Sequence, residues 1–403
     1  MNSTIPAVDT ADSAAADLKT EILALVRQYH AAASLESDCD AAGLAALIGS
    51  LLEMDLGGGR LGEKFESGLA KLFGAREALL VNSGTSANLV AVSALTSPRM
   101  GKLQLKPGDE VITLAAGSPS LAAAIVQNQL VPVFVDISLP AFGVDVRQLQ
   151  SALSSRTRAI ALAHLHGNPF DLDAVTMFAA FNNLLLIEDC RDAAGASFAG
   201  RPVGCYGQFA TVSFHSGRQL STGEGGAVIT SSPLYRSIAS SFRDGGRGEM
   251  PGYNLRASEM QAALGAGQLE TLEGRLTERA YQAKAMVDGM AGLGDSLILP
   301  ESLRTARPSW LELPLALKEN APFGRDKLVS GLVAAGIPAR AFSPNLATQP
   351  AFHERPHRRA GTLRMTDFAA RQGLLVRVPP AAGQPDVTSI VEAFHQTIGD
   401  LRR

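Results

Sequence analysis

The segment VNSGTSANLVAVSAL, residues 81–95, carries residues suited to binding a phosphate group. A strand-like pattern leads into Gly84, Thr85 and Ser86, and a helical pattern follows. The free amides at a helix N-terminus, together with two hydroxyls, form a cradle for phosphate. A small-residue N-cap would explain the same residues, so the segment indicates an anion site only in combination with others.

A pair of carboxylates ends an apolar strand pattern in LLLIEDCRDAAGA, residues 184–196. Glu188 and Asp189 are expected at the carboxyl end of a parallel strand, where α/β sheets place their ligands. Beneath a pyridine nitrogen, such a carboxylate would hold the proton that makes the ring an electron sink. The structural alternative is a capping carboxylate.

The segment SFHSGRQLSTGEGG, residues 213–226, adds a serine and a run of glycines. Ser213 can donate to a phosphate, and the glycines permit tight turns and close backbone approach. The segment contains no lysine, and none occurs between Lys106 and Lys284. A reaction that needs a lysine amine in this region therefore has none available.

The elements that position these residues follow an α/β pattern. Short β-branched runs alternate with helical stretches, which predicts a mostly parallel, doubly wound sheet. An amphipathic first helix is predicted over residues 17–34, after a loose N-terminal tail. We expect an N-terminal tail and helix (1–49), a large cofactor-binding domain (50–275), and a small C-terminal domain with its linking helix (276–403).

Composition excludes several function classes. The formal charge of −3 shows no basic excess, so it gives no support for a nucleic-acid partner or an anionic membrane surface. No apolar run is long enough to span a membrane, and no signal peptide is visible. Three scattered cysteines form neither a disulfide framework nor a metal pattern, so we expect no metal site and a cytoplasmic, reducing location.

Taken together, these segments resemble the DegT/DnrJ/EryC1/StrS aminotransferase family of deoxysugar and antibiotic biosynthesis, from about residue 50 to the C-terminus. Within this family, the sequence most resembles the nucleotide-sugar 3-dehydrases, typified by CDP-4-keto-6-deoxyglucose 3-dehydrase. The similar segments include LKPGDEVITLAAG, AHLHGNPFDL, GYNL and NLATQPAF. It implies the type I fold of aspartate aminotransferase. We therefore expect a mostly parallel seven-stranded sheet in the large domain and a small α+β C-terminal domain.

The resemblance also assigns site residues. Asp189 would pair with the pyridine nitrogen of the cofactor, pyridoxamine 5′-phosphate or pyridoxal 5′-phosphate, bound without a covalent link. Asn254 would reach a cofactor phosphate in the partner subunit of a homodimer, or of a dimer with a paralogue. Asp192, three residues after Asp189, is typical of the dehydrases. The phosphate itself would be held by Gly84, Thr85, Ser86 and Ser213.

Three departures from the family pattern affect the chemistry. Arg218 stands where aminotransferases have the Schiff-base lysine and 3-dehydrases a histidine, and a guanidinium forms no ordinary imine. Ser118 replaces the aromatic ring that stacks on the cofactor. The cysteines of an iron–sulfur cluster are missing, with Arg191 standing at one of their positions, so we expect no cluster.

These departures leave several hypotheses open. The favoured one is a dehydratase-type, non-transaminating reaction on a nucleotide-linked keto sugar, with His215 as the base, because imidazole titrates near neutral pH. In a second hypothesis for the site, the guanidinium groups of Arg191 and Arg218 bind an anionic substrate between them. The alternatives are a catalytically degenerate partner subunit and an aminotransferase. His215 also has a purely structural interpretation, His164 and His166 are interpreted as structural, and the arginine-rich composition allows drift at position 218.

Overall fold

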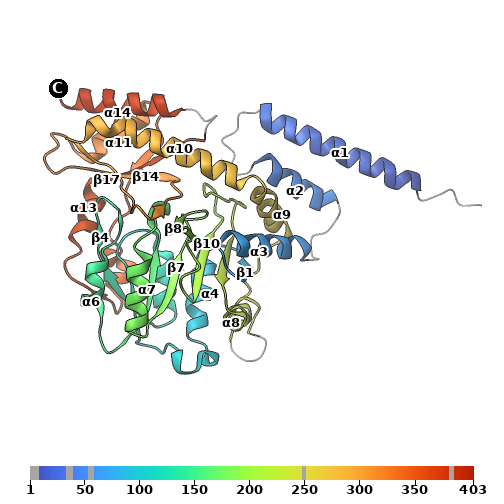
Figure 1. Cartoon of the computed structure of the whole chain (residues 1–403), viewed down its shortest axis with the longest axis horizontal. Coiled ribbons are helices and arrows are strands. Elements are labelled where there is room, and N and C mark those ends of the chain that lie inside the picture. Colours follow the sequence, from blue (N-terminus) through green and yellow to red (C-terminus); the bar gives the residue numbers. More distant parts are fainter. Residues whose placement is uncertain (1–8, 33–39, 53–58, 247–250, 381–384) are drawn as a thin grey trace, which may run out of the picture.

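An eight-stranded sheet forms the centre of the protein, as the computed structural model shows (Figure 1), in the order β1-β11-β10-β7-β6-β2-β3-β16. The structure describes residues 9–32, 40–52, 59–246, 251–380 and 385–403. β11 runs antiparallel to both of its neighbours, and the remaining strands run parallel to one another. The strands are β1 (Glu77–Val81), β2 (Glu110–Leu114), β3 (Val131–Val135), β6 (Thr157–Ala163), β7 (Leu185–Asp189), β10 (Phe209–Ser213), β11 (Gly226–Thr230) and β16 (Arg358–Arg359).

Helices cover both faces of this sheet, because successive side chains on each strand point to opposite sides. On β7, Leu186 packs into the core on one face, whereas Leu185 and Ile187 pack into the core on the other. One face is covered by α3 (Arg60–Leu72), α7 (Leu172–Phe181) and α9 (Glu259–Leu269). The other face is covered by α4 (Gly84–Leu95), α5 (Ser120–Gln127) and α8 (Pro233–Arg243).

This architecture confirms the predicted type I fold with a large, mostly parallel sheet. The sheet has one strand more than the seven predicted. The additional strand, β16, comes from the C-terminal part of the chain and pairs with β3. Two residues are too few to leave an alternating pattern in the sequence, so this strand could not be predicted.

A second, antiparallel sheet lies in the C-terminal part, in the order β12-β14-β17-β15. It shares an apolar core with α10, α11 and α14. Its elements are β12 (Leu297–Ile298), β14 (Glu312–Leu317), β15 (Ala339–Ala341), β17 (Gly373–Arg377), α10 (Leu272–Met290), α11 (Arg325–Ala334) and α14 (Val387–Leu401). Between these, Leu346 and Phe352 pack beside Phe134 of the large sheet. The domain boundaries at 49/50 and 275/276 stay predictions.

The remaining elements are short, apart from the two N-terminal helices described next. The pair β4–β5 and a three-stranded sheet in the order β13-β8-β9 lie outside the two main sheets. The elements are β4 (Ile137–Ser138), β5 (Gly143–Val144), β8 (Ser197–Phe198), β9 (Arg201–Pro202), β13 (Ala306–Arg307), α6 (Leu149–Ala152), α12 (Pro350–His353) and α13 (Arg364–Gln372).

Two helices precede the large sheet. α1 (Asp9–Ala32) is the predicted first helix, but it begins within the segment expected to be a loose tail. It projects from the body next to α2 (Ala41–Leu52), a helix that was not predicted (Figure 1). α2 packs closely on α9, since a Cβ at Gly267 would lie 2.5 Å from the Ala42 carbonyl oxygen.

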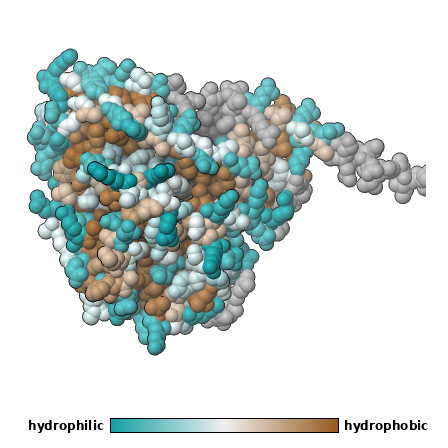
Figure 2. Space-filling model, viewed as in Figure 1, coloured by the Kyte–Doolittle hydropathy of each residue, from teal (hydrophilic) through white to brown (hydrophobic). Residues whose placement is uncertain are grey.

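The surface mixes polar and apolar residues. Hydrophilic and hydrophobic residues are interspersed over the face seen in Figure 2. Among the helices that the structure describes, none is both long and apolar enough to cross a membrane. The cytoplasmic location stays a prediction.

Candidate active site

The turn between β1 and α4 brings the predicted phosphate-binding residues to the carboxyl edge of the sheet. Ser83 caps α4, because its Oγ accepts the Ser86 backbone N–H at 3.1 Å. Gly84 is the first residue of the helix, and a Cβ there would lie 2.5 Å from the Cβ of Ser213. Glycine therefore allows the helix N-terminus to lie directly against the end of β10.

The hydroxyls of this turn differ in their availability. The Ser86 hydroxyl donates to the Asn82 Oδ1 at 2.6 Å and is buried, so it stabilises the turn. Thr85 is exposed at the start of the helix. The first amides of an α-helix have no partner within the helix, so this turn can receive an anion. The structure thus brings together four of the predicted residues: Gly84, Thr85, Ser86 and Ser213.

Asp189, the last residue of β7, is held in a buried polar network. Its Oδ2 accepts the Asn88 Nδ2–H at 3.3 Å, and the Asn88 Oδ1 accepts the Thr211 hydroxyl at 2.6 Å. Asn88 and Thr211 are both buried, and satisfied networks of this kind fix side-chain orientation. Asn88 was not among the residues predicted from the sequence. Its signal is an amide in an otherwise apolar helical segment, one turn after Gly84.

Arg191 covers the carboxylate of Asp189. Its backbone N–H donates to Oδ1 at 3.0 Å, its Nε donates to Oδ2 at 3.1 Å, and its Nη2 lies 2.9 Å from Oδ2. The same Nη2 also donates to the Ser120 hydroxyl at the start of α5. Asp189 is therefore paired with a cation supplied by this chain.

Arg218 and Asp192 form a second ion pair beside the first, with the Arg218 Nη1 donating to the Asp192 Oδ1. Burial lowers the pKa of Arg218, and the Arg191 cation lowers that pKa further. A guanidinium nevertheless stays charged in proteins and cannot accept a proton. Because each arginine already has a carboxylate partner, the two do not form the open anion clamp considered from the sequence.

His215 lies on the exposed side of the loop that follows β10. Its Nδ1 is 2.8 Å from the Ser216 carbonyl oxygen, and its Nε2 is 3.7 Å from the Glu224 Oε1. Its side chain is 57% exposed. The structure therefore leaves Nε2 of this imidazole accessible to solvent and to ligands.

His166 is the histidine that the structure sets apart. It follows β6 with a left-handed φ of 57°, is buried, and its Nε2 has no hydrogen-bond partner among the described residues. Its ring packs 5.3 Å from that of Phe342. Burial lowers the pKa of His166 to about 4. This residue is neutral at physiological pH, and Arg218 is among the charges that act on it.

Ser118 lines a small cavity together with Asp189 and Arg191. The cavity is lined by Ser118, Asp189, Arg191 and Leu346, among others, and its volume is about 20 Å³. That is close to the space for a single water molecule. The Ser118 hydroxyl is 3.4 Å from that of Ser120, so the loop before α5 is tied to the serine that Arg191 contacts.

Asn254 lies on the surface of the chain. It is exposed and forms an isolated backbone bridge with Asp244. An exposed position is what a residue that reaches into a partner subunit requires. Its predicted contact with the partner's cofactor stays a prediction.

A cluster of possible metal ligands lies below the sheet edge, formed by the buried residues His164, Glu188 and Cys190. The Glu188 carboxylate is already saturated, because it accepts the backbone N–H groups of Gly204, Tyr206 and Gly207 at 2.8–2.9 Å. His164 adds a contact at 3.2 Å through Nε2. The cluster has the contacts of a structural network, and the absence of a metal and of an iron–sulfur cluster stays a prediction.

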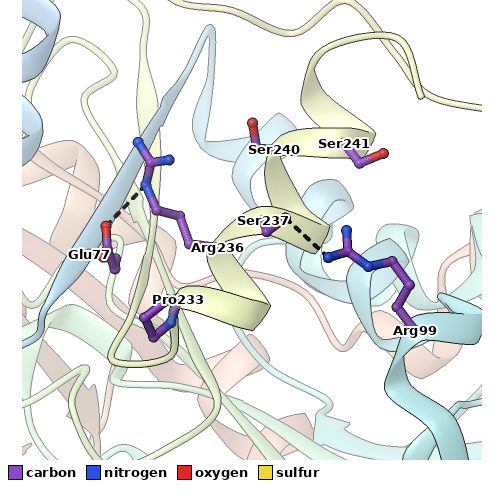
Figure 3. Close-up of a pocket in the computed structure, with 7 residues that line it drawn as sticks. All are labelled: Glu77, Arg99, Pro233, Arg236, Ser237, Ser240 and Ser241. Carbon is purple, nitrogen blue, oxygen red and sulfur yellow. Dashed lines mark hydrogen bonds and ion pairs between the residues drawn. The ribbon is translucent and has the colours of Figure 1, made fainter. Parts of the chain in front are cut away.

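A larger cavity lies elsewhere, beside α8 and the start of β1 (Figure 3). Its volume is about 500 Å³, and it contains no predicted site residue. Arg236 points toward it but is paired with Glu77 at 3.1 Å and with Glu66 at 3.3 Å. The lining residues are Glu77, Arg99, Pro233, Arg236, Ser237, Ser240 and Ser241.

Residues 43–395 match the DegT/DnrJ/EryC1/StrS aminotransferase family. The chain is 36% identical to the lipopolysaccharide biosynthesis protein RfbH of Salmonella typhimurium, over 88% of this chain and 89% of that protein. It is 35% identical to the dTDP-4-dehydro-2,6-dideoxy-D-glucose 3-dehydratase of Saccharopolyspora spinosa, over 96% and 94%.

Solved structures agree with these sequence matches. The E. coli GDP-4-keto-6-deoxy-D-mannose-3-dehydratase, determined with bound hydrated PLP, superposes with a TM-score of 0.81 at 25% identity. The superposition covers 89% of this chain and 97% of that one. The similarity therefore extends over both the large sheet and the C-terminal part.

Proposed function

The chain belongs to the DegT/DnrJ/EryC1/StrS aminotransferase family, and we propose that it is a dehydratase-type enzyme acting on a nucleotide-linked keto sugar or a related anionic substrate. The reaction would serve deoxysugar or natural-product biosynthesis. The observation that carries the proposal is the ion pair of Arg218 with Asp192, in a region without any lysine. A transaminating amine is missing there, whereas Asp189 remains at the sheet edge.

The proposed cofactor is pyridoxamine phosphate or pyridoxal phosphate, held without a covalent bond. Gly84 and Ser213 lie close together at the N-terminus of α4, where they would hold the phosphate. Asp189, oriented by Asn88, would face the ring nitrogen. These residues fit the two ends of such a cofactor, provided that Arg191 leaves Asp189. When bound, the cofactor would supply an electron sink.

We assign proton transfer to Nε2 of His215. If the Nδ1–H group donates to the Ser216 carbonyl, the lone pair lies on Nε2, where a proton can be accepted. Glu224, 3.7 Å from Nε2, would stabilise the imidazolium that results. The role of Arg218 and Asp192 is then to hold the loop of residues 213–226 against the end of β7.

The partner of the chain is proposed to be a second copy of itself. Exposed Asn254 would complete the site of the other subunit, and a paralogous subunit is the alternative. The substrate would bind where the two subunits meet, beside Asp189 and His215.

The test incubates the purified protein with a stoichiometric amount of pyridoxamine phosphate and a nucleotide-linked 4-keto-6-deoxy sugar. Mass spectrometry should detect loss of the C3 hydroxyl, and the visible absorption spectrum should report cofactor binding. The Arg147→Ala variant is the control, because this arginine is exposed and forms its ion pair with Asp145, away from the predicted site residues. A protein that binds neither cofactor at millimolar supply would refute the proposal.

A second candidate function is favoured by the contact between Arg191 and Asp189. A degenerate family member that serves as a partner or regulatory subunit would have no need for an accessible Asp189. The replacement of a stacking aromatic ring by Ser118 points the same way. This candidate predicts that a catalytically active paralogue gains activity or stability when the chain is added.

A further inference from the structure

We infer that Arg191 is an internal competitor of the cofactor ring for Asp189, so that binding of the ring and the Arg191–Asp189 ion pair exclude one another. The inference rests on the proposed function, because it assigns Asp189 to the ring nitrogen. It concerns a residue type that departs from the family pattern at this position. Arg191 would set how tightly the cofactor is held.

The Asp189 carboxylate is already surrounded by donors on both of its oxygens. A carboxylate offers about four lone-pair positions. Oδ1 accepts from the Arg191 backbone N–H, Oδ2 accepts from Asn88, and the single Arg191 Nε–H is shared between the two oxygens. The Arg191 Nη2 adds an ionic contact at 2.9 Å. A protonated ring nitrogen could bind only where one of these donors leaves.

Of these donors, the Arg191 side chain is the one that can leave. Asn88 is fully buried and is bound on its other side to Thr211, so it belongs to the core of the sheet edge. The Arg191 side chain retains 11% exposure, and a long arginine side chain has several rotatable bonds. The guanidinium is therefore the group that must move.

The space beside Asp189 is too small for the ring while Arg191 is in place. The guanidinium bridges Asp189 to Ser120, and Arg191 lines the cavity together with Ser118 and Leu346. The room left there is about 20 Å³, enough for one water and far below what an aromatic ring needs. Displacing Arg191 would vacate this space and release Asp189 in the same movement.

The buried charge of Asp189 requires one cationic partner. The Asp189 side chain is only 3% exposed, and a buried carboxylate without a cation is strongly unfavourable. Guanidinium and protonated pyridine can each satisfy it, but two cations on one carboxylate repel. Removal of the arginine should therefore increase the affinity of Asp189 for a cationic ring, rather than weaken the site.

The test measures dissociation constants for pyridoxal phosphate and pyridoxamine phosphate by spectroscopic titration and equilibrium dialysis, without any turnover. We expect Arg191→Ala to bind at least one of the two at least tenfold more tightly than the wild-type chain. Arg191→Gln, which keeps hydrogen bonding and removes the charge, should gain in the same direction and guards against misfolding of the first variant. Adding Asp189→Asn to Arg191→Ala should abolish the gain.

The matched control is Arg358→Ala. Arg358 donates to the buried carboxylate of Glu110 at 3.0 Å, so this variant removes one of the two arginines paired with a buried acid, while Arg156 stays at 3.1 Å. Its melting temperature should fall as that of Arg191→Ala does, but its cofactor affinity should stay unchanged. Addition of cofactor should raise the melting temperature of Arg191→Ala more than that of the wild-type chain or of Arg358→Ala.

The outcomes separate this inference from the proposed function. Equal or weaker cofactor binding by both Arg191 variants, with measurable binding by the wild-type chain, would overturn the inference and leave the function intact. Binding by the variants alone would support the inference and refute the function of the wild-type chain as an enzyme. Binding by none of the proteins would overturn both.

Discussion

Replacing His166 with asparagine should remove a large part of the loss of stability that the protein suffers in acid. Burial depresses the pKa of His166 to about 4, with a smaller opposing effect from Glu312 and further lowering by Arg340 and Arg218. In the unfolded chain the imidazole returns to its ordinary pKa of about 6.5. The unfolded state thus binds a proton that the folded state rejects.

The sign and the magnitude follow from this difference. The stability contributed by neutral His166 is complete above pH 6.5 and is lost as the pH falls toward 4, because protons then favour the unfolded chain. The full difference corresponds to about 3.4 kcal/mol, and about 2 kcal/mol of it is lost by pH 5. Asparagine cannot titrate and tolerates the left-handed backbone at this position.

The assay is urea denaturation of both proteins at pH 7.5 and pH 5. The variant loses the contact with Phe342 at both pH values, so its stability is lower throughout, but its decline between the two should be smaller by about 2 kcal/mol. His353→Asn, at an exposed histidine, is the control and should decline as the wild-type protein does. An equal decline for His166→Asn and the wild-type protein would refute the argument from burial.

Three further predictions concern the proposed reaction. His215→Ala should lower the dehydration rate by about 10²–10⁴-fold, the usual effect of losing a general base, with cofactor affinity unchanged; loss of binding instead would contradict the role in proton transfer. Asp189→Asn should lower the rate further, since a neutral amide cannot hold a proton on the ring nitrogen, and single-turnover kinetics would show it. Light scattering should report a dimer, and a monomer well above assay concentration would exclude the shared site with Asn254.

Much of the fold and part of the site could be predicted because their signals are local. The β7 pattern ends at Asp189, and the start of α4 is marked by Gly84, so periodicity and turn chemistry suffice for both. α2 was missed because AAGLAALIGSLL is apolar almost throughout and has no helical periodicity to detect. β16 was missed because its two residues gain their strand geometry only from β3.

The pairing of the charged residues could not be predicted in the same way. Sequence placed Arg191 and Arg218 near the cofactor position and left open whether they bind an anion. The answer depends on side-chain conformations, which neighbours far apart in the sequence decide. Ser120, 71 residues before Arg191, holds its guanidinium. His166 is buried partly by Phe342 of the C-terminal sheet, and nothing adjacent to it in the sequence marks that contact.

The ion pair of Arg218 with Asp192 sharpens the question of whether drift alone removed the lysine. Arg218→Lys would place an ammonium beside the Asp192 carboxylate, and a nearby opposite charge favours the charged form of a lysine. Only the free amine attacks an aldehyde, so this ion pair opposes imine formation at position 218. The single variant should therefore trap little pyridoxal phosphate on borohydride reduction.

Arg218→Lys combined with Asp192→Asn should behave differently. The Asp192 carboxylate, which favours the ammonium, is then absent. Burial and the Arg191 cation, which already lower the pKa of Arg218, remain and favour the free amine. Mass mapping should then find a pyridoxyl adduct at position 218 of the double variant, and none in the wild-type chain or in Asp192→Asn alone. If the single Arg218→Lys variant were labelled as fully as the double variant, Asp192 would not control this position, and drift at one residue would be the sufficient explanation.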